Sequence, residues 1–304
     1  MRLAALSVDL DEIPNYFQIH GLGVPQGPAA DLVYDVALER LGRFAADNEL
    51  PLTLFAIGAD MARTGNAERL RAMVEHGHEI GNHSLDHLYD LTRRSRDEMH
   101  RQVAAGVTVL SGATGVRPTG FRAPGYTLTD GLVRVLEEVG VTYDSSVFPC
   151  PPYYLAKAAK LGAIRLARRH SLSVLDRPSV LRAPRRPYRL GEPYFKRGQG
   201  LVELPVQVTR GLRLPFIGTT LTLAGATRAR WLTRAVLGEP LVNLELHGID
   251  VLDAADGLEA LRGHQPDVRV PHGEKIAALA AVVETLKRGG YSFVRLDEAA
   301  QRFS

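Results

Sequence analysis

Short apolar runs alternate with segments of helical periodicity along most of the chain, and this alternation constrains the fold more than any other feature. The runs are rich in Leu, Val and Ile, which is typical of strands buried on both faces. They lie at residues 3–8, 52–57, 79–82, 120–124, 142–144, 201–206, 241–246 and 291–296. Because strands that alternate with helices pair in parallel, we predict an α/β fold, a distorted (β/α) barrel of about seven parallel strands.

Two stretches interrupt the alternation. Residues 14–28 hold several Gly and Pro residues and are expected to be irregular. Residues 150–200 combine Pro-rich turns with a basic run that includes Arg165, Arg168 and Arg169. We expect this basic segment, at about 150–200, to be an insertion within a single domain that spans residues 1–304, because no linker divides the chain. Its helical pattern suits an ordinary amphipathic helix or a helix that lies on an anionic membrane.

Composition excludes several classes of protein. With 304 residues, of which 45% are hydrophobic and 23% charged, the chain can bury a full core. The formal net charge is only +3, and we expect no nucleic acid partner. The single cysteine, Cys150, rules out an internal disulfide. No apolar segment approaches the roughly 20 residues that a membrane span requires. We therefore expect a cytoplasmic location, with the inner face of the membrane as an alternative.

Charged residues and histidines gather where the predicted strands end. His83 and His87 follow the third strand, and two imidazoles four residues apart can face one divalent metal ion. Taken alone, the pair is better explained as two polar loop residues, because ten histidines make such spacings common by chance. Other strand ends carry Asp9, Asp11, Glu12, Arg122, Asp144 and His247. In a barrel these ends meet at one mouth, and the set suits metal-assisted hydrolysis of an acyl bond.

Five short motifs lie in order across residues 7–248. They are SVDLD at 7–11, HSLDH at 83–87, FRAPGY at 121–126, YDSS at 143–146 and LELH at 244–247. They resemble the motifs of the polysaccharide deacetylase family, also called carbohydrate esterase family four or the nodulation-protein deacetylase homology domain. The resemblance implies a metal-dependent hydrolase that removes an N-acetyl group from an amino sugar in a polysaccharide or glycoconjugate.

The resemblance also implies a role for each motif residue. Asp9 would be the general base, held and oriented by Arg122, and His247 would be the general acid. One divalent metal ion, with Zn²⁺ as the default for an imidazole-rich set, would be bound by Asp11, His83 and His87. The residues expected to support these ligands or to contact the N-acylated sugar substrate are Glu12, Asn82, Tyr126 and Asp144.

The first motif departs from the family pattern, which is normally Thr-Phe-Asp-Asp. Leu10 separates its two acidic residues, and a further acidic residue, Glu12, follows. Glu12 therefore competes with Asp11 as the third metal ligand, although we favour Asp11.

The fourth motif departs more strongly. Val147 and Phe148 stand where the family has an aspartate and a tryptophan. This change removes the carboxylate that would orient His247, and Asp144 or Asp250 could replace it.

Two alternative functions stay open. The first is a deformylase or deacetylase of a sugar carried on a polyprenyl phosphate at the membrane surface. The spacing of the first motif and the basic, apolar insertion indicate this alternative, which implies peripheral contact with an anionic membrane or a lipid-linked substrate. The second is a non-catalytic sugar- or glycolipid-binding relative, which the degenerate fourth motif indicates.

Overall fold

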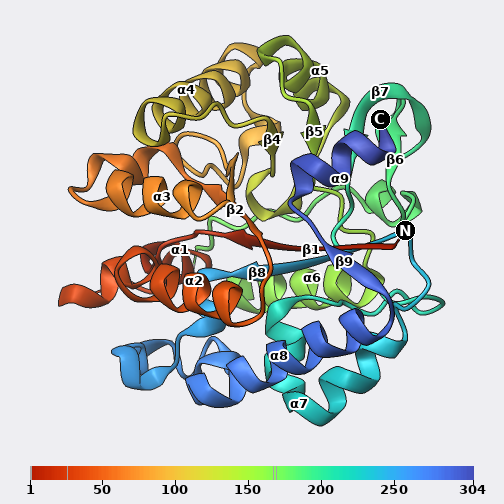
Figure 1. Cartoon of the computed structure of the whole chain (residues 1–304). Coiled ribbons are helices and arrows are strands. Elements are labelled where there is room, and N and C mark those ends of the chain that lie inside the picture. The colour runs from red at the N-terminus through yellow and green to blue at the C-terminus, as the bar shows by residue number, and fades with distance from the viewer. Residues whose placement is uncertain (1, 26, 167, 169) are drawn as a thin grey trace.

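One mostly parallel sheet carries the fold. The computed structural model describes residues 2–25, 27–166, 168 and 170–304 (Figure 1). The strands of this part of the chain are β1 Arg2–Asp9, β2 Leu52–Ala56, β3 Glu79–Asn82, β4 Gly120–Phe121, β5 Tyr143–Asp144, β6 Tyr188–Leu190, β7 Arg197–Glu203, β8 Leu241–His247 and β9 Tyr291–Phe293. Their order is β6-β7-β5-β4-β3-β2-β1-β8, and β9 pairs with β1. Only β6 pairs antiparallel, with β7, among the described strands.

Helices surround this sheet. They are α1 Ile13–Ile19, α2 Leu38–Asp47, α3 Asn66–Glu75, α4 Arg96–Thr114, α5 Asp130–Val139, α6 Pro151–Leu166, α7 Gly218–Arg234, α8 His272–Arg288 and α9 Leu296–Phe303. Figure 1 shows α3, α4 and α5 on one side of the strands and α7 and α8 on the other. Ser95 caps the start of α4, where its Oγ accepts from Glu98 N at 3.2 Å.

The sheet curls into a distorted barrel. Strands β7 and β8, which lie at the two ends of the parallel part of the sheet, do not form a regular ladder. Instead, the chain just after β7 forms a few hydrogen bonds with β8. Gln207 N donates to Asn243 O at 3.1 Å, and Asn243 Nδ2 donates to Leu204 O at 3.0 Å. The predicted α/β fold and distorted barrel are thus confirmed, and eight of the nine described strands pair in parallel.

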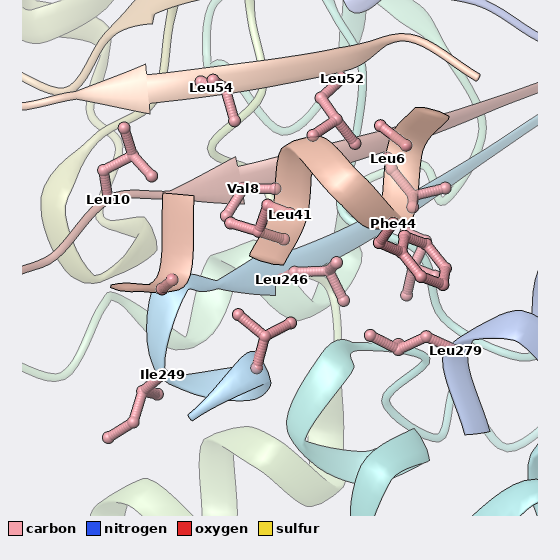
Figure 2. Packing of buried hydrophobic residues seen from close by; sticks show 14 of the residues in the cluster. Leu6, Val8, Leu10, Leu41, Phe44, Leu52, Leu54, Leu246, Ile249 and Leu279 are labelled. Carbon is pink, nitrogen blue, oxygen red and sulfur yellow. The ribbon is translucent and has the colours of Figure 1, made fainter. Parts of the chain in front are cut away.

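The largest part of the core lies between the strands and helices α2, α7 and α8. Leu6 and Val8 of β1 pack in this layer with Leu41 and Phe44 of α2 (Figure 2). Successive side chains of a strand point to opposite faces. Ser7 and Asp9, which alternate with Leu6 and Val8 along β1, therefore point into the barrel. The same alternation therefore builds the core and delivers polar groups to the interior.

The two irregular stretches contain more structure than predicted. The first includes α1, because a proline is tolerated in the first helical turn and Glu12 accepts a hydrogen bond from Ile13 N. In the second, α6 forms, and the chain then returns to the sheet as β6 and β7. Arg165 and Arg168 are exposed, whereas Arg169 lies outside the described residues. No helix in the described part of the chain is long and apolar enough to cross a membrane.

Candidate active site

Four strands bring polar groups to one end of the barrel. Asp9 ends β1 and His247 ends β8, while His83 follows β3 and Arg122 follows β4. These four strands lie in the order β4-β3-β2-β1-β8, in which only β2 separates them, so their carboxyl ends share one end of the barrel. The predicted convergence of residues far apart in the sequence is therefore present.

Asp11, His83 and His87 form a buried cluster of possible ligand atoms. Asp11 Oδ1 lies 3.3 Å from the Nε2 atoms of both His83 and His87, and the two Nε2 atoms are 3.1 Å apart. Asp11 Oδ1 has no hydrogen-bond partner among the described residues although it is buried. Three lone-pair donors that face one point, one of them an orphaned carboxylate oxygen, fit a divalent metal ion.

The tautomer of His83 and the charge of His87 also suit a cation. His83 Nδ1 lies 2.7 Å from the backbone oxygen of Arg122, to which it donates, and its Nε2 is then left as the lone-pair donor. Burial lowers the pKa of His87 to about 4, so this ring is neutral at pH 7. A neutral imidazole is the form that binds a metal.

The loop conformation of residues 83–87 explains how both rings reach the same point. The segment is not helical, and Ser84 and His87 adopt positive φ angles of 68° and 52°. His87 N donates to Ser84 Oγ at 3.1 Å, which closes the turn. A positive φ is uncommon for residues other than glycine and is often found where function requires it.

Asp9 and Arg122 form a buried ion pair beside the cluster. Arg122 Nη1 donates to Asp9 Oδ1 at 2.7 Å. The remaining guanidinium donors are also used, because Nε donates to Ser145 O and Nη2 donates to the hydroxyls of Ser145 and Ser7, each at 2.8 Å. The guanidinium carbon lies 4.3 Å from the ring centre of Phe55. Arg122 therefore fixes the orientation of Asp9, whose Oδ2 lies 3.9 Å from His83 Nε2.

His247 has a carboxylate partner that the sequence analysis missed. Its Nδ1 lies 2.8 Å from Oε1 of Glu245, which is buried on the same face of β8 two residues earlier. Burial alone would lower the pKa of His247, but the Glu245 carboxylate raises it well above the ordinary value for histidine. The ring is therefore protonated at neutral pH, as a general acid must be.

Neither of the two residues predicted to orient His247 contacts its ring. Asp250 Oδ2 accepts from the backbone N of His247 at 2.9 Å and so supports the chain, not the imidazole. Asp144 lies on β5, where it accepts from the backbone N and the hydroxyl of Ser146, and its carboxyl group contacts that of buried Glu203. Asp144 is not among the residues that line the cavity described below.

Glu12 and Asn82 also have other partners than predicted. The carboxylate of Glu12 accepts from the backbone N atoms of Ile13, Val33 and Tyr34 at 3.0–3.2 Å, and it links the starts of two helical segments. It is therefore directed away from the two histidines. Asn82 Nδ2 donates to Val103 O on α4 at 3.0 Å, and it does not support a ligand imidazole.

A cavity of about 520 Å³ opens onto these groups. Asp9, Asp11, His83 and His247 line its polar end. Tyr126, predicted to contact the substrate, lies in its wall, with its hydroxyl 3.4 Å from His247 Nε2. The cavity thus gives a ligand access to both candidate proton-transfer groups and to the cluster of ligand atoms.

Comparison with known proteins agrees with the resemblance. Residues 31–143 match the family model described as polysaccharide deacetylase. The chain is 26% identical over 157 residues to a peptidoglycan deacetylase of Helicobacter pylori, over 50% of this chain and 53% of that protein. It is 28% identical over 129 residues to a peptidoglycan-N-acetylglucosamine deacetylase of Bacillus cereus, over 42% of this chain and 56% of the relative. The chain thus spans about half the length of these curated relatives.

Solved structures share the whole fold. One is a Mycobacterium smegmatis protein provisionally assigned as a polysaccharide deacetylase, with a TM-score of 0.60 and 20% identity over 99% of this chain and 89% of that one. Another is the Xyl-CE4 domain of a multidomain xylanase from the hindgut metagenome of Trinervitermes trinervoides, with a TM-score of 0.51 and 14% identity over 99% and 90%. At these identities the likeness concerns the fold alone. With the family model that matches residues 31–143 and with the curated relatives, this fold makes the chain similar to the polysaccharide deacetylase family.

Proposed function

We propose that the protein is a metal-dependent hydrolase that removes an N-acetyl group from an amino sugar in a polysaccharide or glycoconjugate. One observation carries this proposal. The ligand-type cluster of Asp11, His83 and His87 shares a cavity end with a carboxylate held by an arginine and with an imidazole held by a carboxylate. Amide hydrolysis needs these three elements, which are an electrophile for the carbonyl, a base for water and an acid for the leaving amine.

Asp11, His83 and His87 would hold the metal, with Zn²⁺ as the default ion for two imidazoles and one carboxylate. Three protein ligands leave positions open for water and substrate. When bound, such an ion polarises the acyl carbonyl and lowers the pKa of water. Asp11 is the third ligand in this proposal because Glu12 is occupied by three backbone N–H groups.

Two side chains would move the protons. Asp9 is buried, and Arg122 holds one of its oxygens, so its Oδ2 would take a proton from the water that attacks the acyl carbon. His247 is protonated because of Glu245, and its Nε2 faces the cavity near Tyr126. This Nε2 would donate its proton to the nitrogen of the leaving amine, which prevents the amine from re-attacking as the C–N bond breaks.

Acetate release from N-acetylated sugar oligomers tests the proposal. The purified protein, supplied with Zn²⁺, is expected to release acetate, and Asp9→Asn is expected to be slower by about 10²–10⁴-fold with the same metal content. An equal rate in Asp9→Asn would refute the role of Asp9. If the wild type binds the oligomers without any turnover, the protein is a non-catalytic relative. Formate release from N-formyl sugars would indicate the deformylase alternative, and the comparisons favour neither of these alternatives.

Three further expectations stay predictions, namely the single domain, the cytoplasmic location and contact with an anionic membrane. For the last, α6 exposes Leu155 and Leu166, which are 66% and 87% exposed, beside Arg165. Binding to anionic liposomes that weakens with added salt would support such contact. An absence of binding would contradict it.

A further inference from the structure

Helix α6, which the sequence analysis assigned to the basic insertion, forms one wall of the active-site cavity. Tyr153, Lys157, Lys160, Leu161 and Ile164 line the cavity and recur at helical spacing, so they form one face of the helix. The wall is therefore apolar apart from the two lysines. Apolar residues from other elements, Ile19, Pro215, Ile217 and Ile249, continue this surface.

The two lysines have no carboxylate partner. Lys157 Nζ donates to Gly125 O at 3.1 Å, and Lys160 Nζ lies 3.4 Å from His264 O. Within the described residues, neither ammonium group has a carboxylate oxygen within 4.0 Å. An ammonium group at the wall of a mostly apolar cavity attracts an anionic ligand group.

Lys157 lies close to the catalytic groups. Gly125, whose carbonyl it contacts, directly precedes Tyr126, and the hydroxyl of Tyr126 is 3.4 Å from His247 Nε2. The Asp9 and Asp11 carboxylates lie at the polar end of the cavity, whereas the two ammonium groups lie on α6, where they attract an anionic ligand group. A ligand could thus present a neutral acyl group to one end and an anion to the other.

The nearest acidic groups form no ion pair with the lysines within 4.0 Å among the described residues. Asp176 is the acidic residue that most affects Lys157; burial raises its pKa to about 6, so it is mostly ionised at pH 7 and attracts Lys157 from beyond that distance. Asp267 acts on Lys160 in the same way. Burial lowers the pKa of Lys157 to about 8, so most of its ammonium form is kept at pH 7. His20, on the same cavity wall as Lys160, is neutral because burial lowers its pKa to about 4.

We propose that the substrate is an N-acyl amino sugar that carries a phosphate group, and that Lys157 and Lys160 bind this phosphate. The inference rests on the proposed function, because it places the acyl group of the same sugar at Asp11, His83 and His87. A phosphate monoester and a phosphate ester of an apolar group present the same anion to the lysines. The apolar residues of α6 would contact only the second.

Calorimetric binding to the Zn²⁺-loaded Asp9→Asn protein tests the proposal without turnover. The ligands are N-acetylglucosamine, N-acetylglucosamine 1-phosphate and the dodecyl ester of that phosphate. Either phosphorylated sugar is expected to bind about tenfold more tightly than the neutral one, because hydrogen bonds between charged groups strengthen binding by about this factor. Tighter binding of the ester than of the monoester would place an apolar group on α6, and the reverse order would indicate a free sugar phosphate.

A lysine variant separates the lysines from the metal, which could also attract phosphate. The double variant Lys157→Gln/Lys160→Gln is made in the same Asp9→Asn protein. Its preference for the phosphorylated sugar is expected to fall to about twofold or less, because the charged hydrogen bonds are lost. Lys287→Gln is the matched control, since Lys287 Nζ on α8 also donates to a backbone carbonyl, Asn48 O, far from the cavity. It is expected to keep the full preference.

Two outcomes would overturn the proposal. One is equal affinity for the neutral and phosphorylated sugars, or no measurable affinity for either. The other is an unchanged preference in the double lysine variant. The proposed function alone is wrong if the wild type releases no acyl group from any of these sugars but still prefers the phosphorylated sugar in a way that depends on the lysines. If acetate release is normal but the preference is absent, the phosphate site alone is wrong.

Discussion

Glu245→Gln isolates the contribution of the newly found carboxylate to His247. Glutamine keeps the shape of the side chain but removes its charge, 2.8 Å from His247 Nδ1. Two unit charges at this distance attract by about 6 kcal/mol at an effective dielectric constant of about 20. Desolvation offsets much of this attraction, and the imidazole is 22% exposed. We therefore use the range for hydrogen bonds to charged groups, about 1.5–3 kcal/mol.

This free energy corresponds to a fall of about one to two units in the pKa of His247, because one unit is about 1.4 kcal/mol. The general acid must be protonated, so its pKa sets the upper pH limit of activity. Since Glu245 raises this pKa, removing its charge moves the limit to lower pH. The assay is kcat/KM for acetate release as a function of pH, in the wild type and in the variant.

Asp250→Asn is the matched control for this prediction. Asp250 also contacts His247, but through the backbone N instead of the ring, so the upper pH limit is expected to move by less than about half a unit. An unchanged limit in Glu245→Gln would refute the assignment of Glu245 as the partner of a protonated His247. A shift of equal size in both variants would show a general charge effect and would also refute it.

Three other variants test the roles of single side chains. Arg122→Lys cannot reproduce the fork that holds Asp9 and two serines, and we expect a loss of about 3–5 kcal/mol in unfolding free energy together with most activity, measured by denaturation and acetate release. Glu12→Ala leaves three buried N–H groups without an acceptor and is expected to cost about 2–4 kcal/mol with unchanged metal content; loss of the metal would contradict this. Phe44→Ala opens the core and is expected to cost about 3–5 kcal/mol without changing metal content.

The sequence was sufficient to predict the barrel and the residues that meet at its mouth. Apolar runs mark buried strands, and the carboxyl ends of parallel strands share one side of a sheet. The positions of Asp9, Asp11 and His247 follow from these two facts. The choice between Asp11 and Glu12 does not follow, because it depends on which side chain finds backbone N–H donors from residues 33 and 34.

The missed partner of His247 had a signal in the sequence. Residues two apart on a strand share a face, so Glu245 could have been identified from the pattern Glu-Leu-His in a strand that is buried on both sides. Asn82 gave no such signal, since only the packing of α4 against β3 directs its amide to Val103. The placement of α6 was also beyond prediction, because its basic and apolar pattern suits a solvated face, a membrane or a cavity wall equally well.

Metal content in the wild type and in His83→Ala tests the central claim most directly. We predict about one divalent ion per chain in the wild type after Zn²⁺ loading and dialysis, measured by plasma mass spectrometry. His83→Ala is expected to retain less than a tenth of that amount, because it lacks one of the three ligands. The matched control is His76→Ala, a change at an exposed histidine of the same stretch, which is expected to leave the content unchanged. Equal metal content in the wild type and His83→Ala would contradict the metal site and the mechanism built on it.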